Sequence, residues 1–403
     1  MAHMRNRYIY PLIKKAKAMS PLIGLLGHRQ VGKTTVLETM CDSYCTLDQK
    51  ADLDLAIKDP DDFLKSHSHL FQGIDECQLA PPLFSALKEF VRKRKSPGQF
   101  LLSGSVRFTS RQAIRESLTG RIVNFELLPL SISEMAHQEL PSSLETLMSQ
   151  LSIDRVIQSL ESRKKEISSL MKEYRYYYNH GGLPGVCFIR DDRLRNLRIK
   201  EQLLTILDRD IRLVYPTTLP YSQILEFLRY IALTQGRPFN YSGAQKVSLI
   251  SAVTQKKLLY ALEAVFLIRR LPIDGTQKGP VFYLEDQAEA KYLLEQNLTA
   301  MDEFEHLIYR NLRTQLFYKL GPSFREFHFL TRGGSRIPYA IELGGFRLGI
   351  LPIEEERPNR RDSAAAASFL KKYGNSRILF LHQGKALTSI DERSLSAPVY
   401  YFV

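Results

Sequence analysis

Residues 27–34 are the feature that most restricts the fold of this chain. They read Gly-His-Arg-Gln-Val-Gly-Lys-Thr and match the pattern G-x-x-x-x-G-K-S/T at every position. An apolar run at 21–26 precedes them, and a helix-forming segment at 33–43 follows. Glycines at such a turn let backbone N–H groups approach a phosphate, and the helix N-terminus adds a partial positive charge. The motif therefore predicts a phosphate-binding loop.

We expect this loop to bind a nucleoside triphosphate together with Mg²⁺. The Lys33 ammonium would reach the β- and γ-phosphates, and the Thr34 hydroxyl would be a magnesium ligand. A glycine-rich turn with a purely structural role is the alternative. The residues assigned to nucleotide binding are Gly27, Gln30, Val31, Gly32, Lys33, Thr34 and Thr35.

An acidic pair, Asp75 and Glu76, follows the apolar run at 70–74. An aspartate at the end of a neighbouring strand can complete the Mg²⁺ shell, and the next glutamate can polarise the attacking water. Such a pair is common after any hydrophobic run. Downstream of a phosphate loop, however, it predicts a metal ligand at Asp75 and a catalytic base at Glu76.

Two further motifs are candidates for contact with the phosphates. Ser103 or Ser105, after the run at 99–102, could sense the γ-phosphate or position the water, or could form a simple strand-to-loop turn. Arg121 ends the turn at 117–121 and could stabilise phosphoryl charge in its own or a neighbouring subunit. A structural arginine paired with an acid is the alternative. The catalytic candidates are Glu76, Arg121 and Ser103.

Apolar runs alternate with helical stretches throughout the first third of the chain. Strands are expected at 21–26, 44–47, 70–74, 99–102 and 122–127, with helices at 33–43 and 80–95. This alternation predicts a parallel sheet covered by helices on both faces. The fold class expected is therefore an α/β P-loop NTPase core, followed by further domains.

These motifs together resemble a known family. GHRQVGKTT, IDECQLAPPLFSALKEFV, FLLSGS, SLTGR and LLPLSISE follow the order found in prokaryotic AAA-type ATPases whose P-loop reads GPRQVGKTT. The resemblance is close over 21–135 and continues in layout through HGGLPG and the segment 208–211. His28 stands where the family has proline, which should change loop stiffness more than chemistry. The resemblance implies ATP and Mg²⁺ as cofactors, with roles for Lys33, Thr34, Asp75, Glu76 and Arg121.

Members of that family continue into a winged-helix-like segment. Helical segments at 224–232, 241–247 and 252–262, followed by an apolar strand at 264–271, fit that outline. In a DNA-binding version, Gln255, Lys256 and Lys257 would enter a major groove. A helical lid or a protein-docking module is the alternative.

The family's last domain resembles a restriction endonuclease, and this chain departs from it at the metal site. Such domains carry an aspartate on one strand and E-x-K on the next, around a divalent metal. Here Pro338 stands in place of the aspartate and Glu356 in place of the lysine, which leaves Glu354. Glu342 could substitute for the lost acid, but nothing replaces the lysine. We therefore expect a nuclease-like fold without nuclease activity.

The domain boundaries follow from these segments. We expect a basic N-terminal arm (1–20), an AAA-type core (21–140), a helical lid or linker (141–222), a winged-helix-like segment (223–275) and a degenerate nuclease-like domain (276–403). The basic arm could instead be a helix packed on the core. The aromatic run at 174–178 could stack nucleobases, but interdomain packing is the favoured interpretation.

Charge and cysteine content restrict partners and compartment. Lys and Arg total 56 against 43 Asp and Glu, a net charge of +13, and the helix at 190–212 is strongly basic. This surplus suits DNA, although charge alone indicates only non-specific attraction. The four cysteines have neither disulfide nor zinc spacing, and no membrane-spanning run or signal peptide appears. The cytoplasm is therefore the expected location.

Two functions remain open on these grounds. The first is a Mg²⁺-dependent ATPase that couples its nucleotide state to a homo-oligomeric assembly, with DNA as the expected partner. The second is a nucleotide-gated switch or scaffold that binds a protein partner through an inactive nuclease-like domain. An active ATP-dependent nuclease is disfavoured by the lost metal-site residues.

Overall fold

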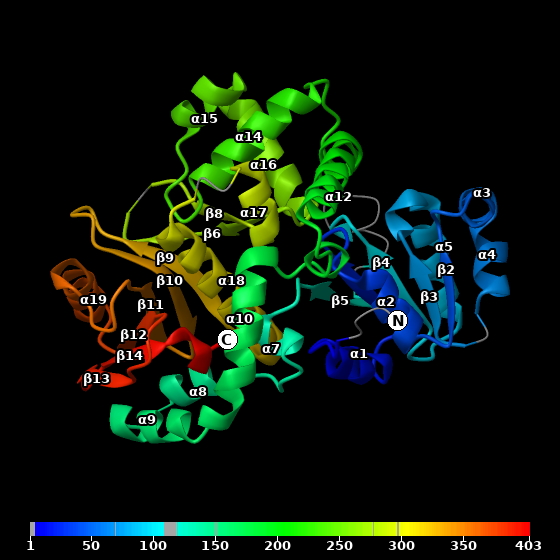
Figure 1. Cartoon of the computed structure of the whole chain (residues 1–403). Coiled ribbons are helices and arrows are strands. Elements are labelled where there is room, and N and C mark those ends of the chain that lie inside the picture. Colours follow the sequence, from blue (N-terminus) through cyan, green and yellow to red (C-terminus); the bar gives the residue numbers. More distant parts are fainter. Residues whose placement is uncertain are drawn as a thin grey trace.

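A five-stranded sheet is the core of the N-terminal part of the chain (Figure 1). The computed structural model describes residues 5–403 except 69, 109–117, 119, 150, 277, 296 and 297. All pairings in this sheet are parallel, as predicted. The strand order is β2-β3-β4-β1-β5, with bounds β1 (Leu22–Gly27), β2 (Ser43–Thr46), β3 (Gln72–Asp75), β4 (Phe100–Gly104) and β5 (Ile122–Leu127).

Helices cover both faces of this sheet. Every residue of β1 is therefore buried. Ile23 and Leu25 pack with α1 (Tyr10–Lys17) and α2 (Lys33–Met40) on one face. Leu22 and Leu26 pack on the other face. The helices there are α3 (Lys50–Lys58), α4 (Pro60–Ser66) and α5 (Pro81–Lys93). Basic residues of the N-terminal segment thus lie on a helix that contributes Ile13 and Ala16 to the core.

A helical region follows the sheet. The polar sequence at 142–178 predicts one or two long helices, and the structure has three there, α8 to α10. The aromatic run at the end of α10 is a packing element: Tyr174 and Tyr177 are buried, and Tyr174 contacts Tyr400 edge-on. The helices are α7 (Ile132–Met135), α8 (Ser143–Met148), α9 (Ile153–Glu161), α10 (Lys164–His180), α11 (Pro184–Cys187), α12 (Asp192–Thr205) and α13 (Ile211–Val214), with a π-helical turn (Ile206–Asp210) between α12 and α13.

Three helices and a small antiparallel sheet come next in the chain. The helices are α14 (Tyr221–Leu233), α15 (Tyr241–Ser248) and α16 (Ala252–Ala264), and the paired strands are β6 (Ile268–Leu271) and β8 (Val281–Leu284). The strand predicted at 264–271 is shorter than expected. Its first part is wrong because Ala264 ends α16 and Phe266 adopts a left-handed turn with φ of 59°.

A seven-stranded mixed sheet forms the C-terminal part of the molecule. Its order is β13-β14-β12-β11-β10-β9-β7. Helix α18 (Ala300–Leu320) contributes to the apolar cluster on one face, and α19 (Arg360–Lys372) covers the other. The neighbouring helix α17 spans Gln287–Leu293. The strands are β7 (Ile273–Asp274), β9 (Arg325–Leu330), β10 (Arg336–Leu343), β11 (Phe346–Pro352), β12 (Ser376–His382), β13 (Thr388–Asp391) and β14 (Ser394–Pro398).

The apolar and aromatic residues at 399–403 predict a strand, and this prediction is wrong. Pro398 ends β14, and a short 3₁₀ helix (Val399–Tyr401) follows. The apolar character that suggested a strand is used for burial instead, since Phe402 and Val403 are both buried. A short apolar run does not by itself distinguish these outcomes.

The described residues bear on two expectations, one about membrane-spanning segments and one about the cysteines. No helix among them is long and apolar enough to cross a membrane. All four cysteines are free thiols, and burial raises the pKa of Cys41 and of Cys45 to about 12. These thiols are therefore protonated at neutral pH.

Candidate functional site

The phosphate loop joins β1 to α2 at the carboxyl edge of the parallel sheet. Gly32 has a φ of 99°, a left-handed conformation that favours glycine. A Cβ at Gly27 would lie 2.4 Å from the carbonyl oxygen of Leu127, so side chains are excluded there. The buried Lys33 ammonium donates hydrogen bonds to the carbonyl oxygens of Gly27 (3.0 Å) and His28 (2.9 Å). The loop therefore curls around this ammonium group.

Oxygen ligands meet beside the loop, where β3 and β4 end. The Thr34 hydroxyl donates to Asp75 Oδ2 at 2.6 Å, and the Tyr44 hydroxyl donates to the same oxygen at 3.2 Å. The Ser103 hydroxyl donates to Asp75 Oδ1. Asp75 is thus held from three sides, with its carboxylate next to the threonine.

This arrangement fits Mg²⁺. A hydroxyl oxygen and a carboxylate oxygen are hard ligands, and Mg²⁺ is usually held by one or two carboxylates plus substrate phosphates and water. Among the described residues, no group of three His, Cys, Asp or Glu side chains could hold a metal ion. Thr34 and Asp75 would therefore supply the protein ligands, and phosphate and water the remainder.

Glu76 lies next to this pair in a left-handed conformation, with φ of 56°. The Gln78 amide donates to its carboxylate, and the Ser105 hydroxyl lies 3.4 Å from the same oxygen. Burial raises the pKa of Glu76, and the positive charges of Lys33 and Arg29 oppose this rise. A half-buried carboxylate fixed in this way is suited to accept a proton from a water molecule.

The two serine candidates therefore contact the acids. Ser103 is fully buried and its hydroxyl is directed at Asp75, while Ser105 and Gln78 hold Glu76. Neither serine lines the cavity in front of the loop. They orient Asp75 and Glu76 in this structure, whereas the sequence pattern suggested direct contact with a phosphate.

Arg121 lies at the opposite edge of the sheet from the phosphate loop. The register of β1 and β5 pairs Ile122 with Leu22, whereas the loop starts at Gly27, which pairs with Leu127. The five residue steps from Ile122 to Leu127 place these two ends of the strand roughly 17 Å apart. The structure thus does not bring Arg121 to the loop of its own subunit, and action on a neighbouring subunit stays a prediction. Ser117 and Thr119 of the same turn lie outside the described residues.

A cavity of about 450 Å³ opens in front of the loop. Gln30, Gly32, Lys33, Thr34 and Thr35 of the predicted set line it, together with Glu76. Val31 is buried beneath the loop and is not part of the wall. Most of the rest of the wall is aromatic, apolar or basic, with one further acid, Asp48. These lining residues are Arg5, Arg7, Tyr10, Arg29, Val36, Asp48, Leu130, Pro184, Gly185 and Phe188.

The N-terminal segment supports the loop from outside, a role that the sequence did not reveal. Arg7 is buried and donates to the carbonyl oxygens of Val31 (3.1 Å) and Leu128 (2.5 Å) and to Glu134 (3.1 Å). Charge alone had suggested only an arm or a packed helix. The specific pairing of Arg7 with a residue 127 positions away has no local sequence signal.

A second contact, also missed, ties the loop to the helical region. Arg29 Nε donates to Asp210 Oδ2 at 2.5 Å, and Arg29 Nη2 lies 3.3 Å from Oδ1. Asp210 is almost fully buried and ends the π-helical turn after α12. Such turns often occur at functional sites. The segment 208–211 is part of the sequence resemblance, but that pattern does not indicate its partner in the loop.

His28 makes a third link. Its Nε2 atom lies 3.3 Å from Glu289 Oε1 on α17, and the Gln202 amide on α12 donates to that oxygen at 2.7 Å. Burial lowers the pKa of His28 to about 4 and raises the pKa of Glu289 well above its usual range. Complete burial thus disfavours the charged form of both side chains.

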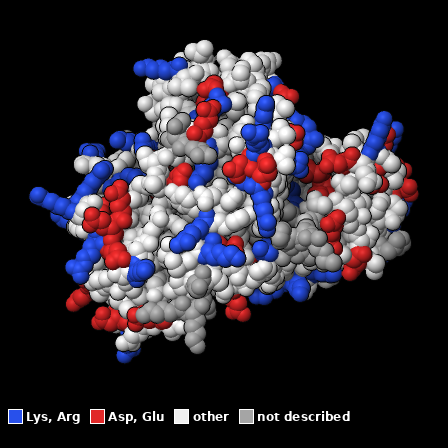
Figure 2. Space-filling view, in the orientation of Figure 1, with Lys and Arg blue, Asp and Glu red and all other residues white. Residues whose placement is uncertain are grey.

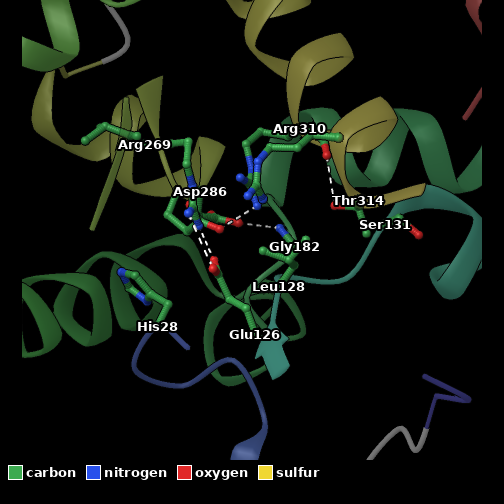
Figure 3. A network of polar contacts seen from close by, with 12 residues as sticks. His28, Glu126, Leu128, Ser131, Gly182, Arg269, Asp286, Arg310 and Thr314 are labelled. Atoms are coloured by element: carbon green, nitrogen blue, oxygen red, sulfur yellow. Dashed lines mark hydrogen bonds and ion pairs between the residues drawn. The ribbon is translucent and has the colours of Figure 1, made fainter. Parts of the chain in front are cut away.

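A network of buried charged residues lies between the parallel sheet and the C-terminal part of the molecule (Figure 3). Arg269 donates to Glu126 at the end of β5 and lies 3.4 Å from Glu285. Arg310 on α18 donates to Glu285 at 2.7 Å. Arg269, Glu285 and Arg310 are all buried. This buried network joins the parallel sheet to the rest of the chain.

Comparisons with known proteins agree with this geometry. A family model described as an AAA domain matches residues 19–136, and one described as a domain of unknown function (DUF8612) matches 171–273. Uncharacterized protein Mb2031c of Mycobacterium bovis and uncharacterized protein Rv2008c of Mycobacterium tuberculosis are each 33% identical over 126 residues. These residues are 30% of this chain and only 28% of each relative.

Two archaeal structures are similar to larger parts of the chain. The Walker-type ATPase PABY2304 of Pyrococcus abyssi covers 70% of this chain and 93% of its own, with 13% identity and a TM-score of 0.39. The STAND protein PH0952 of Pyrococcus horikoshii, which has a tetratricopeptide repeat sensor, covers 79% and 48%, with 14% identity and a TM-score of 0.28. The AAA-domain match and the geometry of the loop together identify residues 19–136 as an AAA-type P-loop domain.

Proposed function

We propose that this protein hydrolyses ATP in a Mg²⁺-dependent reaction and couples its nucleotide state to the assembly of several copies. The observation that carries the proposal is the contact of 2.6 Å between the Thr34 hydroxyl and Asp75, beside Lys33 and Glu76. These four residues supply the phosphate, metal and base functions of a P-loop ATPase at one edge of the sheet.

Each side chain has a distinct part in the reaction. Loop N–H groups and the Lys33 ammonium bind the β- and γ-phosphates, which requires Lys33 to exchange its carbonyl contacts for phosphate oxygens. Thr34 and Asp75 would hold the Mg²⁺, which would neutralise charge that develops on the phosphates. Glu76 would accept a proton from the attacking water. Ser103 keeps Asp75 oriented, and the part of the cavity wall formed by Tyr10 and Phe188 would receive the adenosine end of the nucleotide.

The assembly part of the proposal rests on Arg121. An arginine that is remote from its own loop can stabilise phosphoryl charge only on another subunit. Hydrolysis would then need neighbouring copies, so that turnover per subunit rises with protein concentration. A monomer in Mg-ATP with full turnover would contradict this part of the proposal.

DNA is the proposed partner of the assembly. The arrangement of α14 to α16 with the β6–β8 pair is compatible with a winged helix, and the net charge is +13. Against this, several arginines of the basic stretch contact acids on the same helical segment. These pairs are Arg195 with Asp192, Arg198 with Glu201, Arg209 with Asp210 and Arg212 with Asp208. Their charge is less available to a phosphate backbone than the sequence suggests.

We further propose that the C-terminal domain has no nuclease activity. The order α18-β9-β10-β11-α19-β12, with antiparallel β9 to β11 and parallel β11 and β12, is compatible with a nuclease-like fold. Glu356 accepts hydrogen bonds from the backbone of Lys385 and Ala386, so it stabilises a loop. Cleavage of plasmid DNA in Mg²⁺ or Mn²⁺ that is lost on Glu354→Ala would refute this proposal.

The decisive experiment is steady-state ATP hydrolysis with and without single- and double-stranded DNA. Lys33→Ala should abolish nucleotide binding, and Glu76→Gln should keep binding and abolish turnover. Lys371→Ala, an exposed substitution far from the loop, is the matched control. Turnover that rises with DNA and is lost in both variants supports the DNA-coupled ATPase. Slow turnover indifferent to DNA supports the alternative, a nucleotide-gated scaffold for a protein partner.

A further inference from the structure

Helices α15 and α16 expose an unusual number of large apolar side chains. Leu249 is 77% exposed, Val253 67%, Tyr260 55% and Val247 51%. Val253 and Tyr260 are seven residues apart on α16 and so lie on one face of it. Leu249 has a φ of 60°, a conformation that a leucine rarely adopts, and so ends α15 with its side chain in solvent. Apolar groups gathered in this way mark an interaction surface.

Three lysines lie among these apolar residues. Lys246, Lys256 and Lys257 are exposed, and none forms an ion pair within the described part of the chain. Lys256 and Lys257 occupy the same face of α16 as Val253 and Tyr260. We call this set of seven residues, Lys246, Val247, Leu249, Val253, Lys256, Lys257 and Tyr260, the α15–α16 face.

A DNA groove does not match the chemistry of this face. Gln255 is the amide nearest the start of α16 that could read a base edge, but it is completely buried. Its amide group donates to the carbonyl oxygens of Tyr241 (3.1 Å) and Ile250 (2.8 Å), so both of its hydrogens are used. The α15–α16 face consists of three lysines and four large apolar groups, whereas protein–DNA interfaces are mostly polar.

The same chain carries a surface of complementary charge on α3 and α4. Residues 50–62 contain five aspartates (Asp52, Asp54, Asp59, Asp61 and Asp62) and two lysines, a net charge of 2 − 5 = −3 in a protein of net charge +13. Ile57 lies among them and is 44% exposed. We call these six residues the α3–α4 face. Figure 2 shows acidic side chains along the edge of the molecule where α3 and α4 lie.

The two faces cannot meet within one molecule, because α15 and the pair α3 and α4 lie at different ends of it (Figure 1). We propose that the α15–α16 face of one copy docks on the α3–α4 face of a second copy. A contact between two different faces leaves one free face on each partner, so copies add head to tail into a ring or an open chain. Apolar groups at the centre with charges around them are typical of protein interfaces.

This contact would lie close to the nucleotide site. Asp48 lines the cavity in front of the phosphate loop, and α3 begins two residues later at Lys50. A neighbouring copy that docks on α3 therefore contacts a segment adjacent to the nucleotide. The inference rests on the assembly part of the proposed function and specifies the surfaces that assembly uses.

Charge reversal tests the proposal directly. The assembly is measured by sedimentation and mass photometry of the full chain in Mg-ATP. Lys256→Glu with Lys257→Glu should weaken association at least tenfold, and Asp54→Lys with Asp61→Lys should do the same. The chain that combines all four changes should recover association to within about threefold of the original, since opposite charges again face each other. Lys371→Glu, an exposed reversal far from both faces, is the control and should change nothing.

The outcomes separate this inference from the proposed function. Assembly in Mg-ATP that survives both reversals, or that the combined chain fails to recover, overturns the inference and leaves the ATPase proposal intact. A chain that stays monomeric in Mg-ATP overturns the assembly proposal and this inference together. A labelled DNA duplex that binds the original chain but not the lysine variant, with assembly unchanged, assigns the α15–α16 face to DNA and also overturns the inference.

Discussion

The buried network around Arg269 makes a quantitative prediction about stability. Arg269 is 8% exposed and lies between Glu126 and Glu285, both also buried. Arg269→Met keeps most of the side-chain volume but leaves two carboxylates with one arginine fewer. Removal of one partner from a buried ion pair costs about 3–5 kcal/mol, because a charge stays buried without compensation. Glu285 retains Arg310 at 2.7 Å and Glu126 retains Arg107 at 3.3 Å, so we expect the lower end, about 3 kcal/mol.

Urea denaturation provides the measurement. The chain has no tryptophan and 20 tyrosines, so far-UV circular dichroism and tyrosine fluorescence can both follow unfolding. The matched control is Arg325→Met, since that side chain is 54% exposed and contacts Glu342 at 3.1 Å. It should cost less than about 1 kcal/mol, as surface ion pairs do. Adding Glu126→Gln to Arg269→Met should recover part of the loss. An Arg269→Met cost no larger than that of the control would refute this reasoning.

Two further predictions concern single carboxylates. Asp210→Asn removes the charge that holds Arg29 and should weaken ATP binding about tenfold, or about 1.4 kcal/mol. Calorimetric titration checks this, with Asp208→Asn as the control on a 61% exposed side chain; unchanged or tighter binding would contradict it. Burial raises the pKa of Asp286 to about 6, from an ordinary value of 3.8. The folded state therefore binds this proton more tightly, so the stability that it contributes is present below pH 4 and is lost as the pH rises to 6. The free energy of unfolding of the original chain minus that of Asp286→Asn should fall by up to about 3 kcal/mol across that interval and stay level above it. A difference that is flat from pH 4 to 6 would count against the raised pKa.

The local parts of this structure could be predicted from the sequence. The phosphate loop has a fixed spacing, and the strands that form the parallel sheet are apolar runs of ordinary length, so β1 to β5 lie close to their predicted positions. The position of Asp75 and Glu76 beside the loop could be predicted, because they stand at the carboxyl end of an apolar run. The final apolar run failed as a strand because burial does not require a sheet, and residues 399–401 satisfy it as a helical turn.

The long-range contacts of the site could not be predicted in this way. Arg29 and Asp210 are 181 residues apart, and Arg7 and Glu134 are 127 apart. No periodicity or motif links such pairs; only the folded chain brings them together. The position of Arg121 depended on strand register, because a residue before a parallel strand lies at the opposite edge from a loop that follows one. The motif alone does not determine whether Arg121 lies at the same end of the strands as the phosphate loop.

Two adjacent residues of the phosphate loop are linked to the same helical segment. Arg29 contacts Asp210 directly, and His28 reaches Gln202 on α12 through Glu289. Any shift of α12 that alters these contacts changes the free energy of the loop, and so the affinity for nucleotide. Thermodynamic linkage makes the effect reciprocal: nucleotide binding biases the position of α12 by the same free energy. A ligand that binds the loop therefore changes the preferred position of α12, and a ligand that binds α12 changes the nucleotide affinity of the loop.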